Sequence, residues 1–425
     1  MNGNLLVIHA DELATNRGFQ ACGGKAMHDL QIVRDGAVCI EDGTITAVGE
    51  TADVMAAVDP QAFTVIDASG KAVLPGFVDS HTHFIFGGYR AEEFAWRLQG
   101  MSYMDIMARG GGIASTVEAT RQADLASLVR TGRQRLDAML AFGVTTVEGK
   151  SGYGLDRDTE IRQLEAMAIL EEEHPIDVVA TFLGAHAVPR EFRGRADAYL
   201  DFIMAEVLPL VAERRLAEFC DIFCEDQVFS IDQSRRLLHH AKTLGLKLTL
   251  HADEIVPLGG TELAAELGAV SADHLLHASD DGIRGMAKAG VVAALLPLTA
   301  FGLKEPYARG REMIDQGCAV ALATDLNPGS CFSNSVPLLI ALATLYMGLT
   351  PEEALTAITL NGAAAVGRAD RVGSLEPGKQ GDVVILAYPS YRFMPYHIGV
   401  NTVESVIKKG HLVFDQRKGG VIHAG

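Results

Sequence analysis

The sequence predicts an α/β fold: a (β/α)8 TIM barrel with a small β-sandwich domain built from both chain termini. Two observations lead to this prediction. Eight short apolar runs alternate with segments of helical periodicity in the middle of the chain, which is the pattern of repeated βα units. Turn-rich β segments precede and follow them, so we expect residues 1–72 and 367–425 to form the small domain and residues 73–366 to form the barrel.

Length and composition agree with this architecture. The chain has 425 residues, of which 48% are hydrophobic and 21% charged, as in a compact protein with a large core. It contains no run of 18 apolar residues, and the opening "MNGNLLVIHADEL" lacks the basic start and apolar stretch of a secretory signal. Six cysteines without a C-x-x-C motif suggest reduced thiols. We therefore expect a cytoplasmic protein.

The charge balance restricts the partners. Lys and Arg number 36 and Asp and Glu number 54, which gives a net charge of −18. An acidic chain of this kind is not expected to bind nucleic acid or an anionic membrane. An anionic substrate would need a local arginine or lysine.

The terminal segments contain the signals of paired strands. The stretch "GAVCIEDGTITAVGE" at 36–50 shows apolar alternation interrupted by Asp-Gly, a strong hairpin signal. Near the other end, "GSLEPGKQGDVVIL" and "VESVIKKGHLVF" also combine turn residues with apolar runs. We expect these strands to pair in one small domain.

The eight barrel strands can be named one by one. Helical stretches such as "TEIRQLEAMAILEEE" and "SIDQSRRLLHHAKTLG" lie between them, the second opening at a serine cap and closing at glycine. In chain order the strand-like runs are "AVLPGFVD", "GVTTVEG", "DVVATFLGAH", "FCDIFCE", "LKLTLHADE", "SADHLLH", "VVAALLP" and "AVALATD".

Polar side chains gather where these runs end. His81 and His83 follow the first run, and because residues i and i+2 of an extended chain point to one side, their imidazoles can meet. Barrel enzymes place their chemistry at the carboxyl ends of the strands. A single residue of this kind is more often a structural one whose hydrogen bonds are made by its neighbours. Polar residues at the ends of five strands, however, indicate a site. The others are His186, His251, Glu254, His274 and Asp325.

This set of donors suits a metal ion. Three imidazoles and one carboxylate are ligands for Zn²⁺ or iron, with a position left for water. Such an ion lowers the pKa of water to about 7 and so permits hydrolysis at neutral pH.

The strings "PGFVDSHTH", "LHADE", "ADH" and "ATDLNPGS", in that order on eight strands, resemble the amidohydrolase superfamily over nearly the whole chain. The strings "HTHFIFGGYRAEEF", "EGKSGYGL" and "TFLGAHAVP" are similar to the branch that opens 4-imidazolone-5-propanoate to N-formimidoyl-L-glutamate in histidine degradation. The resemblance implies the metal ligands His81, His83, His251 and Asp325. It implies substrate or product contacts at Arg90, Tyr153, His186, Glu254, Asn327, Gly329 and Ser330. At position 330, threonine is expected as often as serine, and either supplies a hydroxyl.

The expected cofactor is one metal ion per chain, zinc or iron. Many members of the superfamily carry a carboxylated lysine on strand four that bridges two metals, and strand four here ends in "FCED" without a lysine. Glu225 as a bridge, or Lys150 on strand two as a displaced carbamate, remains an open alternative. The spacing His251-x-x-Glu254 resembles the one-metal branch.

Hypothetical roles follow from what cyclic-amide hydrolysis requires. Asp325 could remove a proton from water, His274 could polarise the carbonyl or only orient Asp325, and Glu254 could protonate the ring nitrogen. Deamination of a nucleobase-like ring and a non-catalytic scaffold are competing interpretations. Arg90 favours cyclic-amide hydrolysis because a propanoate tail requires a guanidinium. The resemblance also suggests a homodimer.

The glycine-rich stretch "ARGGGIAST" at 108–116 lacks the lysine of a phosphate loop. We expect a mobile loop after strand one that could cover the site.

Overall fold

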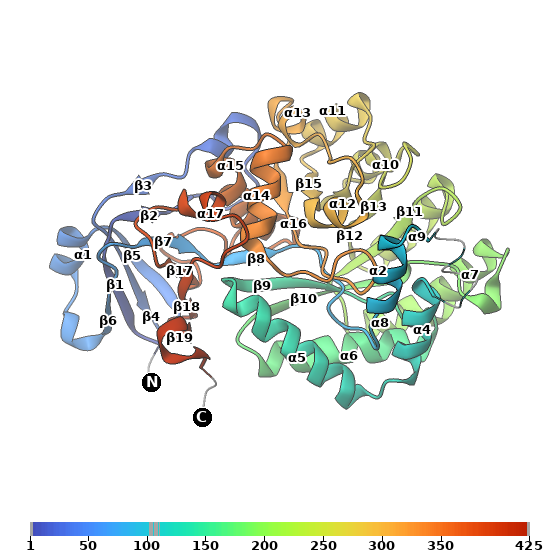
Figure 1. Cartoon of the computed structure of the whole chain (residues 1–425), viewed down its shortest axis with the longest axis horizontal. Helices are drawn as coiled ribbons and strands as arrows, with labels where there is room; N and C mark the ends of the chain where they lie inside the picture. Colours follow the sequence, from blue (N-terminus) through green and yellow to red (C-terminus); the bar gives the residue numbers. More distant parts are fainter. Residues whose placement is uncertain (1–2, 102–104, 106–108, 110, 423–425) are drawn as a thin grey trace.

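The computed structural model describes the chain except residues 1–2, 102–104, 106–108, 110 and 423–425. A barrel of strands and helices occupies one side of the molecule and a smaller β domain the other, with both termini emerging from the β domain (Figure 1). The predicted fold class is confirmed. Of the predicted loop at 108–116, residues 108 and 110 lie outside the described residues, and residues 113–116 belong to helix α4, which begins at Ile113.

Eight consecutive parallel strands form the barrel sheet within the described residues. Each strand pairs with the next along the chain, and a parallel bridge between Thr82 and Leu326 joins the segments that follow the first and the last. A ninth short strand, β12 (Lys247–Leu248), pairs with β11 in line with β13. The barrel strands are β8 (Phe77–Asp79), β9 (Val144–Lys150), β10 (Asp177–Ala185), β11 (Phe219–Cys224), β13 (His251–Ala252), β14 (Ser271–His274), β15 (Val292–Leu295) and β16 (Val320–Leu322).

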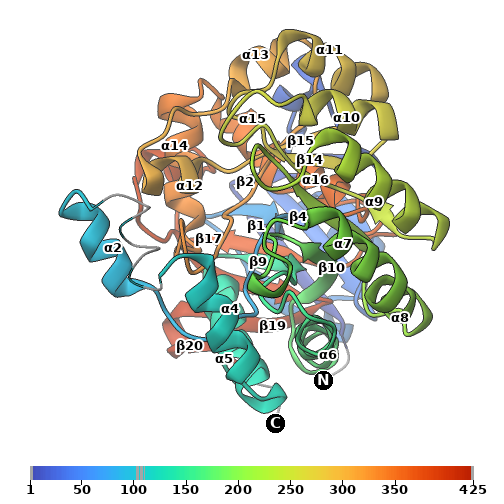
Figure 2. The same cartoon turned by 90° about the vertical axis from the view of Figure 1, so that its right-hand side faces the viewer.

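Helices surround this sheet, and their ends follow local rules (Figure 2). In α9, Ser230 and Gln233 form a capping box, as the serine signal predicts. The helices of this part are α2 (Ala91–Leu98), α4 (Ile113–Gln122), α5 (Leu125–Ala141), α6 (Arg157–Glu173), α7 (Ala196–Phe202), α8 (Leu208–Glu213), α9 (Ile231–Thr243), α10 (Gly260–Leu267), α11 (Asp280–Ala289), α12 (Pro297–Leu303), α13 (Gly310–Asp315), α14 (Val336–Tyr346), α15 (Pro351–Ile358) and α16 (Leu360–Ala365). Short 3-10 or π turns are η1 (Gly24–His28), η2 (Pro60–Ala62), η3 (Arg190–Phe192), η4 (Ile203–Val207) and η5 (Gln416–Lys418).

The first predicted barrel run, "AVLPGFVD", is in fact two strands in two sheets. Its first half is β7 (Ala72–Pro75), which pairs with strands of the β domain, and only its second half, β8, enters the barrel. The chain changes sheets at Gly76, where a Cβ atom would collide with the Thr145 side chain. The boundary that we propose between residues 72 and 73 therefore falls inside β7.

The β domain joins the two ends of the chain in two sheets. The four-stranded sheet has the order β5-β4-β1-β6 and the seven-stranded sheet β20-β19-β18-β17-β7-β2-β3. The Asp-Gly signal is confirmed: Asp42 and Gly43 both have positive φ and turn β4 into β5, as a two-residue hairpin requires. Apolar residues from both sheets, among them Val7, Val38 and Ile385, pack as one core. The elements are β1 (Leu5–Ala10), β2 (Glu12–Ala14), β3 (Ile32–Val33), β4 (Gly36–Glu41), β5 (Thr44–Glu50), α1 (Thr51–Ala57), β6 (Thr64–Asp67), β17 (Val383–Leu386), α17 (Phe393–Tyr396), β18 (Val403–Lys408), β19 (His411–Asp415) and β20 (Gly420–Val421).

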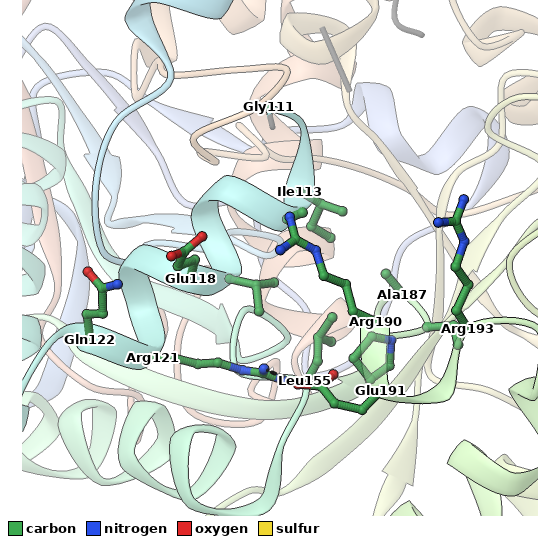
Figure 3. A pocket seen from close by; sticks show the side chains of 14 residues that line it. Gly111, Ile113, Glu118, Arg121, Gln122, Leu155, Ala187, Arg190, Glu191 and Arg193 are labelled. Atoms are coloured by element: carbon green, nitrogen blue, oxygen red, sulfur yellow. Dashed lines mark hydrogen bonds and ion pairs between the residues drawn. The ribbon is translucent and has the colours of Figure 1, made fainter. Parts of the chain in front are cut away.

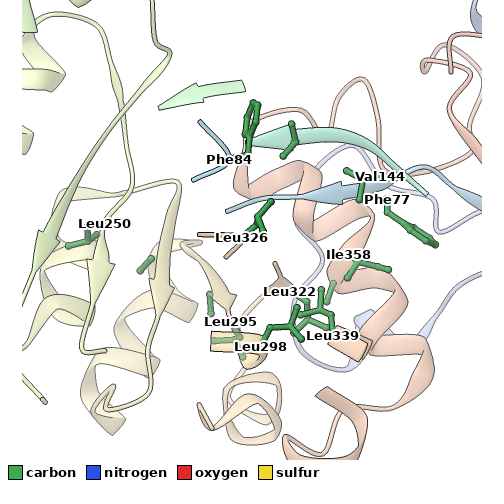
Figure 4. Packing of buried hydrophobic residues seen from close by; sticks show 14 of the residues in the cluster. Phe77, Phe84, Val144, Leu250, Leu295, Leu298, Leu322, Leu326, Leu339 and Ile358 are labelled. Carbon is green, nitrogen blue, oxygen red and sulfur yellow. The ribbon is translucent and has the colours of Figure 1, made fainter. Parts of the chain in front are cut away.

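The barrel core is apolar and closely packed. Phe77 and Val144 from the strands lie near Ile358, and Leu322 lies near Leu298 and Leu339 of the helices (Figure 4). Burial of such side chains stabilises the strands by roughly 1.5–3 kcal/mol each. No helix among the described residues is long and apolar enough to cross a membrane.

Candidate metal centre and active site

The side chains that end the barrel strands converge at one point. The Nε2 atoms of His81 and His83 each lie 3.6 Å from Oδ1 of Asp325. The ring centroid of His251 lies 4.7 Å from that of His81 and 5.5 Å from that of His83. Two groups of possible ligand atoms share His81: one with His83 and His251, the other with His274 and Asp325, each within 4.8 Å. The four predicted ligands and His274 thus form one buried cluster.

Backbone contacts hold the first and last strand ends in register. The backbone N–H of Asp325 donates to the carbonyl of His81 at 3.0 Å, and that of His83 donates to Leu326 at 2.8 Å. Asp325 and His274 have positive φ values of 52° and 74°, a region that non-glycine residues seldom adopt. Strained backbone of this kind concentrates at functional sites because the surrounding structure must impose it.

Carboxylates behind two of the histidines determine which ring nitrogen is free. Nδ1 of His81 is hydrogen-bonded to Asp273 Oδ2 at 2.7 Å, and Nδ1 of His251 lies 2.9 Å from Asp221 Oδ2. Their Nε2 atoms are buried and have no hydrogen-bond partner among the described residues. An imidazole that gives its Nδ1 proton to a carboxylate directs the Nε2 lone pair at a metal. The residues present therefore fit a metal ion.

Burial shifts the pKa values of the side chains in the cluster. It lowers the pKa of the ligands His81 and His83 and of the neighbouring His274 well below the usual value, which favours neutral rings. At His251 burial acts in the same direction, but the charge of Asp221 outweighs burial and raises the pKa. Burial also raises the pKa of Asp325 to about 6, against the hydrogen bond that its Oδ2 accepts from Thr299 Oγ1 at 2.6 Å. An uncompensated buried carboxylate is costly, so a cation beside Asp325 would stabilise its charged form.

Glu254 faces the cluster from the loop after β13. Its Oε2 lies 3.5 Å from Nε2 of His274. Burial, reinforced by the charge of Asp325, raises the pKa of Glu254 to about 8. A raised pKa favours the protonated form of this carboxyl group, which is the property required of a general acid.

Aromatic rings line the side of the cluster near His83. His186, after β10, stacks on His83 with a centroid distance of 5.0 Å and an interplanar angle of 15°. Tyr153, after β9, lies 5.3 Å from His186 between ring centroids and is buried. Both are predicted contact residues, and the structure brings them together beside the cluster.

The remaining predicted contact residues form a second group. Asn327 Oδ1 accepts hydrogen bonds from the backbone of Gly329 and Ser330, each at 2.8 Å, so Asn327 holds this loop in shape. A Cβ atom at Gly329 would displace the Arg90 guanidinium, so glycine allows the guanidinium to lie against this backbone. Arg90 is partly buried, and its Nε donates to Glu93 at 2.8 Å.

The structure does not support the alternative bridging groups. Glu225 accepts hydrogen bonds from the backbone of Ile255 at 2.8 Å and Val256 at 3.3 Å, and so organises the loop after β13. Lys150 Nζ lies 2.9 Å from carboxylate oxygens of Glu148 and Asp221 and 3.3 Å from Asp273. A carbamate in this position would place a fourth negative group among three carboxylates.

Sequence reasoning missed the residues that support the ligands: Asp221, Asp273 and Thr299. A signal for Asp221 was available, because a carboxylate in the middle of the apolar run "FCDIFC" has to be paired. Which residue pairs with Asp221 depends on the register between strands and cannot be read from one strand.

A cavity of about 830 Å³ adjoins the loops of the site. It lies between α4 and the segment after β10, with Arg121, Arg190 and Arg193 around it (Figure 3). Leu155 and Ala187 line it and lie close in sequence to Tyr153 and His186. Among the described residues, its lining includes none of the predicted site residues.

A sequence model described as "Amidohydrolase family" matches residues 64–126 and 114–414. The chain is 58% identical to an imidazolonepropionase of Clostridium tetani (strain Massachusetts / E88), over 97% of this chain and 98% of that protein. It is 60% identical to imidazolonepropionases of Parabacteroides distasonis and Bacteroides thetaiotaomicron, over 97% of this chain and 99% of each relative.

Solved structures share the fold. A triazine hydrolase variant matches with a TM-score of 0.74 at 16% identity, over 99% of this chain and 96% of that chain. An adenosine deaminase from Xanthomonas campestris with bound zinc matches with a TM-score of 0.67 at 20% identity, over 99% and 94%. At these identities the likeness concerns the fold alone.

Proposed function

The chain belongs to the amidohydrolase family and, within it, to the imidazolonepropionases, and from this premise we propose that it hydrolyses 4-imidazolone-5-propanoate to N-formimidoyl-L-glutamate in histidine degradation. The observation that carries the proposal is the meeting of His81, His83, His251 and Asp325 at the carboxyl ends of the strands. In the reaction the ring bond between the carbonyl carbon and nitrogen breaks. The carbon gains the hydroxyl of water and the nitrogen gains a proton.

We propose that these four residues hold one ion, zinc or iron. The free Nε2 atoms of His81 and His251 and the nearby Asp325 carboxylate support this assignment. When bound, such an ion supplies Lewis-acid chemistry, which makes water acidic enough to react at neutral pH. The ligand set does not distinguish the two metals.

Three side chains serve as the base, the hydrogen-bond donor and the acid of the reaction. Asp325 is placed to accept a proton from the attacking water, since its Oδ1 faces the ligand histidines. His274 is neutral and adjacent, so it donates a hydrogen bond to the substrate carbonyl or orients its neighbours. Glu254 holds the ring nitrogen and gives it a proton as the carbon–nitrogen bond breaks, consistent with its raised pKa of about 8.

The propanoate carboxylate is the group that Arg90 binds in this proposal. A guanidinium forms paired hydrogen bonds with a carboxylate, and Tyr153 and Ser330 supply hydroxyls. The close approach of Gly329 to Arg90 brings the loop that carries Asn327 and Ser330 to this side chain. His186, stacked on His83, contacts the substrate ring.

We further propose a cytoplasmic homodimer without nucleic-acid or membrane partners. The net charge of −18 supports the part of the proposal that concerns nucleic acid and anionic membranes. Domain boundaries near residues 72 and 366 belong to the same proposal.

The decisive assay uses freshly generated 4-imidazolone-5-propanoate, with mass and NMR identification of the product. N-formimidoyl-L-glutamate formed at an enzymatic rate supports the proposal. Release of ammonia from a panel of nucleobases, with no turnover of the propanoate, would replace it with deamination. No turnover of either class by metal-loaded protein would favour a non-catalytic scaffold.

A further inference from the structure

Lys150 is buried in the barrel interior, and its side chain is only 1% exposed. It ends β9 and lies among carboxylates of three other positions, Glu148, Asp221 and Asp273. A buried ammonium group is unfavourable unless it is paired, so this arrangement depends on all its partners. The proposed reaction does not use Lys150.

Two of these carboxylates are the groups behind the ligand histidines. Oδ2 of Asp273 contacts both Lys150 Nζ and His81 Nδ1, at 3.3 and 2.7 Å. Oδ2 of Asp221 contacts both Lys150 Nζ and His251 Nδ1, each at 2.9 Å. One ammonium group therefore connects the supports of two ligands, one from the segment after β8 and one from β13.

We propose that Lys150 is a positioning residue of the metal centre, whose ammonium group fixes Asp221 and Asp273 so that His81 and His251 keep their Nε2 atoms directed at one metal ion. Without this cation the two buried carboxylates repel each other and lose their shared donor. Either can then rotate away from its histidine, which frees the ring to turn or to change tautomer. Groups that support metal ligands in this way typically change metal affinity 10–100-fold when removed.

The chain offers a matched control in Lys408. Its side chain is 2% exposed, and its Nζ lies 2.8 Å from Asp177 and 2.7 Å from Asp382. Lys408 ends β18 in the β domain, and Asp177 begins β10 at the end of that strand opposite to His186. Replacement of either lysine by methionine removes one buried cation from a group of carboxylates, three around Lys150 and two around Lys408. Only the group around Lys150 includes carboxylates that contact ligand histidines.

The test measures the Zn²⁺ dissociation constant of metal-free protein by competition with a chromophoric chelator. Lys150→Met is expected to weaken binding at least 10-fold, whereas Lys408→Met stays within about twofold of the parent. A smaller loss in Lys150→Met, or equal losses in both variants, overturns the inference. If Lys150→Met does not fold, Lys150→Arg decides: it keeps the charge, so binding must stay within about threefold of the parent, and a larger loss overturns the inference.

A double-mutant cycle with Asp273→Asn separates positioning from general stability. If Lys150 acts through Asp273, the double variant loses less affinity than the product of the two single effects. Independent effects would contradict the proposed route. The inference rests on the proposed metal centre, and the parent protein tests that first: a parent that binds no metal refutes the centre itself, whereas a parent that binds while Lys150→Met is unchanged refutes only the role of Lys150.

Discussion

Two buried charge clusters, one at the start of strand β10 and one beside its middle, have similar charges but different consequences. At its start, Asp177 and Asp382 enclose Lys408, and Gln380 donates to both carboxylates, at 2.8 and 2.9 Å. Further along β10, beside Thr181 and Phe182, Asp221 and Asp273 enclose Lys150, and each also contacts a histidine ring. The first cluster satisfies its carboxylates within itself, whereas the second leaves buried ring nitrogens without a partner among the described residues.

This difference identifies the functional end of the barrel more sharply than burial or charge does. Both clusters cost desolvation and both need all their members. Only the cluster at the carboxyl ends of the strands contains buried histidine nitrogens that lack a partner among the described residues and can bind a metal ion. The start of β10 joins the barrel to the β domain, so its charges serve the fold.

The largest effect is expected from Glu254→Gln. The amide keeps the shape of the side chain but cannot transfer a proton, so kcat should fall about 10²–10⁴-fold while metal content stays at the parent level. Steady-state kinetics and elemental analysis of the same preparation measure both quantities. Turnover within a few-fold of the parent would reduce Glu254 to a positioning group.

Lys408→Met should affect stability rather than chemistry. Removal of Lys408 leaves Asp382 without its cation and Asp177 with Lys409 as its remaining cation, at a cost of up to about 3–5 kcal/mol in the free energy of unfolding. Chemical denaturation measures the loss, and kcat/KM of the folded fraction should equal that of the parent. A selective fall in kcat/KM at unchanged stability would remove the contrast between the two clusters.

Arg90→Met should weaken turnover of the propanoate substrate. A charged hydrogen-bonded pair of about 1.5–3 kcal/mol corresponds to roughly 10- to 100-fold in kcat/KM, mainly through KM. The control is the uncharged amide of the substrate, whose turnover should barely change. Equal losses on both compounds would show that Arg90 supports the loop beside Gly329 and does not bind the carboxylate.

The smallest effect concerns pH and Asp177. Burial acts to raise its pKa, but Lys408, Gln380 and Lys409 outweigh burial and lower it to about 2. An unfolded aspartate has a pKa of about 3.9, so the stability that Asp177 contributes is present above pH 4 and is lost as the pH falls through 2. The difference in unfolding free energy between the parent and Asp177→Asn, up to about 2.6 kcal/mol, should therefore shrink below pH 4. Denaturant titrations at pH 6, 4 and 3 measure it, and a constant difference would contradict this role.

Much of this account could be predicted from the sequence, because its signals are local. The Asp42-Gly43 turn, the Ser230 cap and the polar residues after each apolar run follow from backbone rules that act over a few residues. The division of "AVLPGFVD" between two sheets could not be predicted, since it depends on β17 pairing with β7, which is far away in the chain. The contacts of Asp221 and Asp273 depend on the register between barrel strands, which one sequence does not display.

The most direct test of the central claim is the metal stoichiometry of the active enzyme. Metal-free protein is titrated with Zn²⁺, or anaerobically with Fe²⁺, while imidazolone-propanoate turnover is followed. The account predicts that activity rises linearly and stops at one ion per chain, and that His81→Ala shows neither tight binding nor activity. A requirement for two tightly held ions per chain, or full activity without metal, would contradict it.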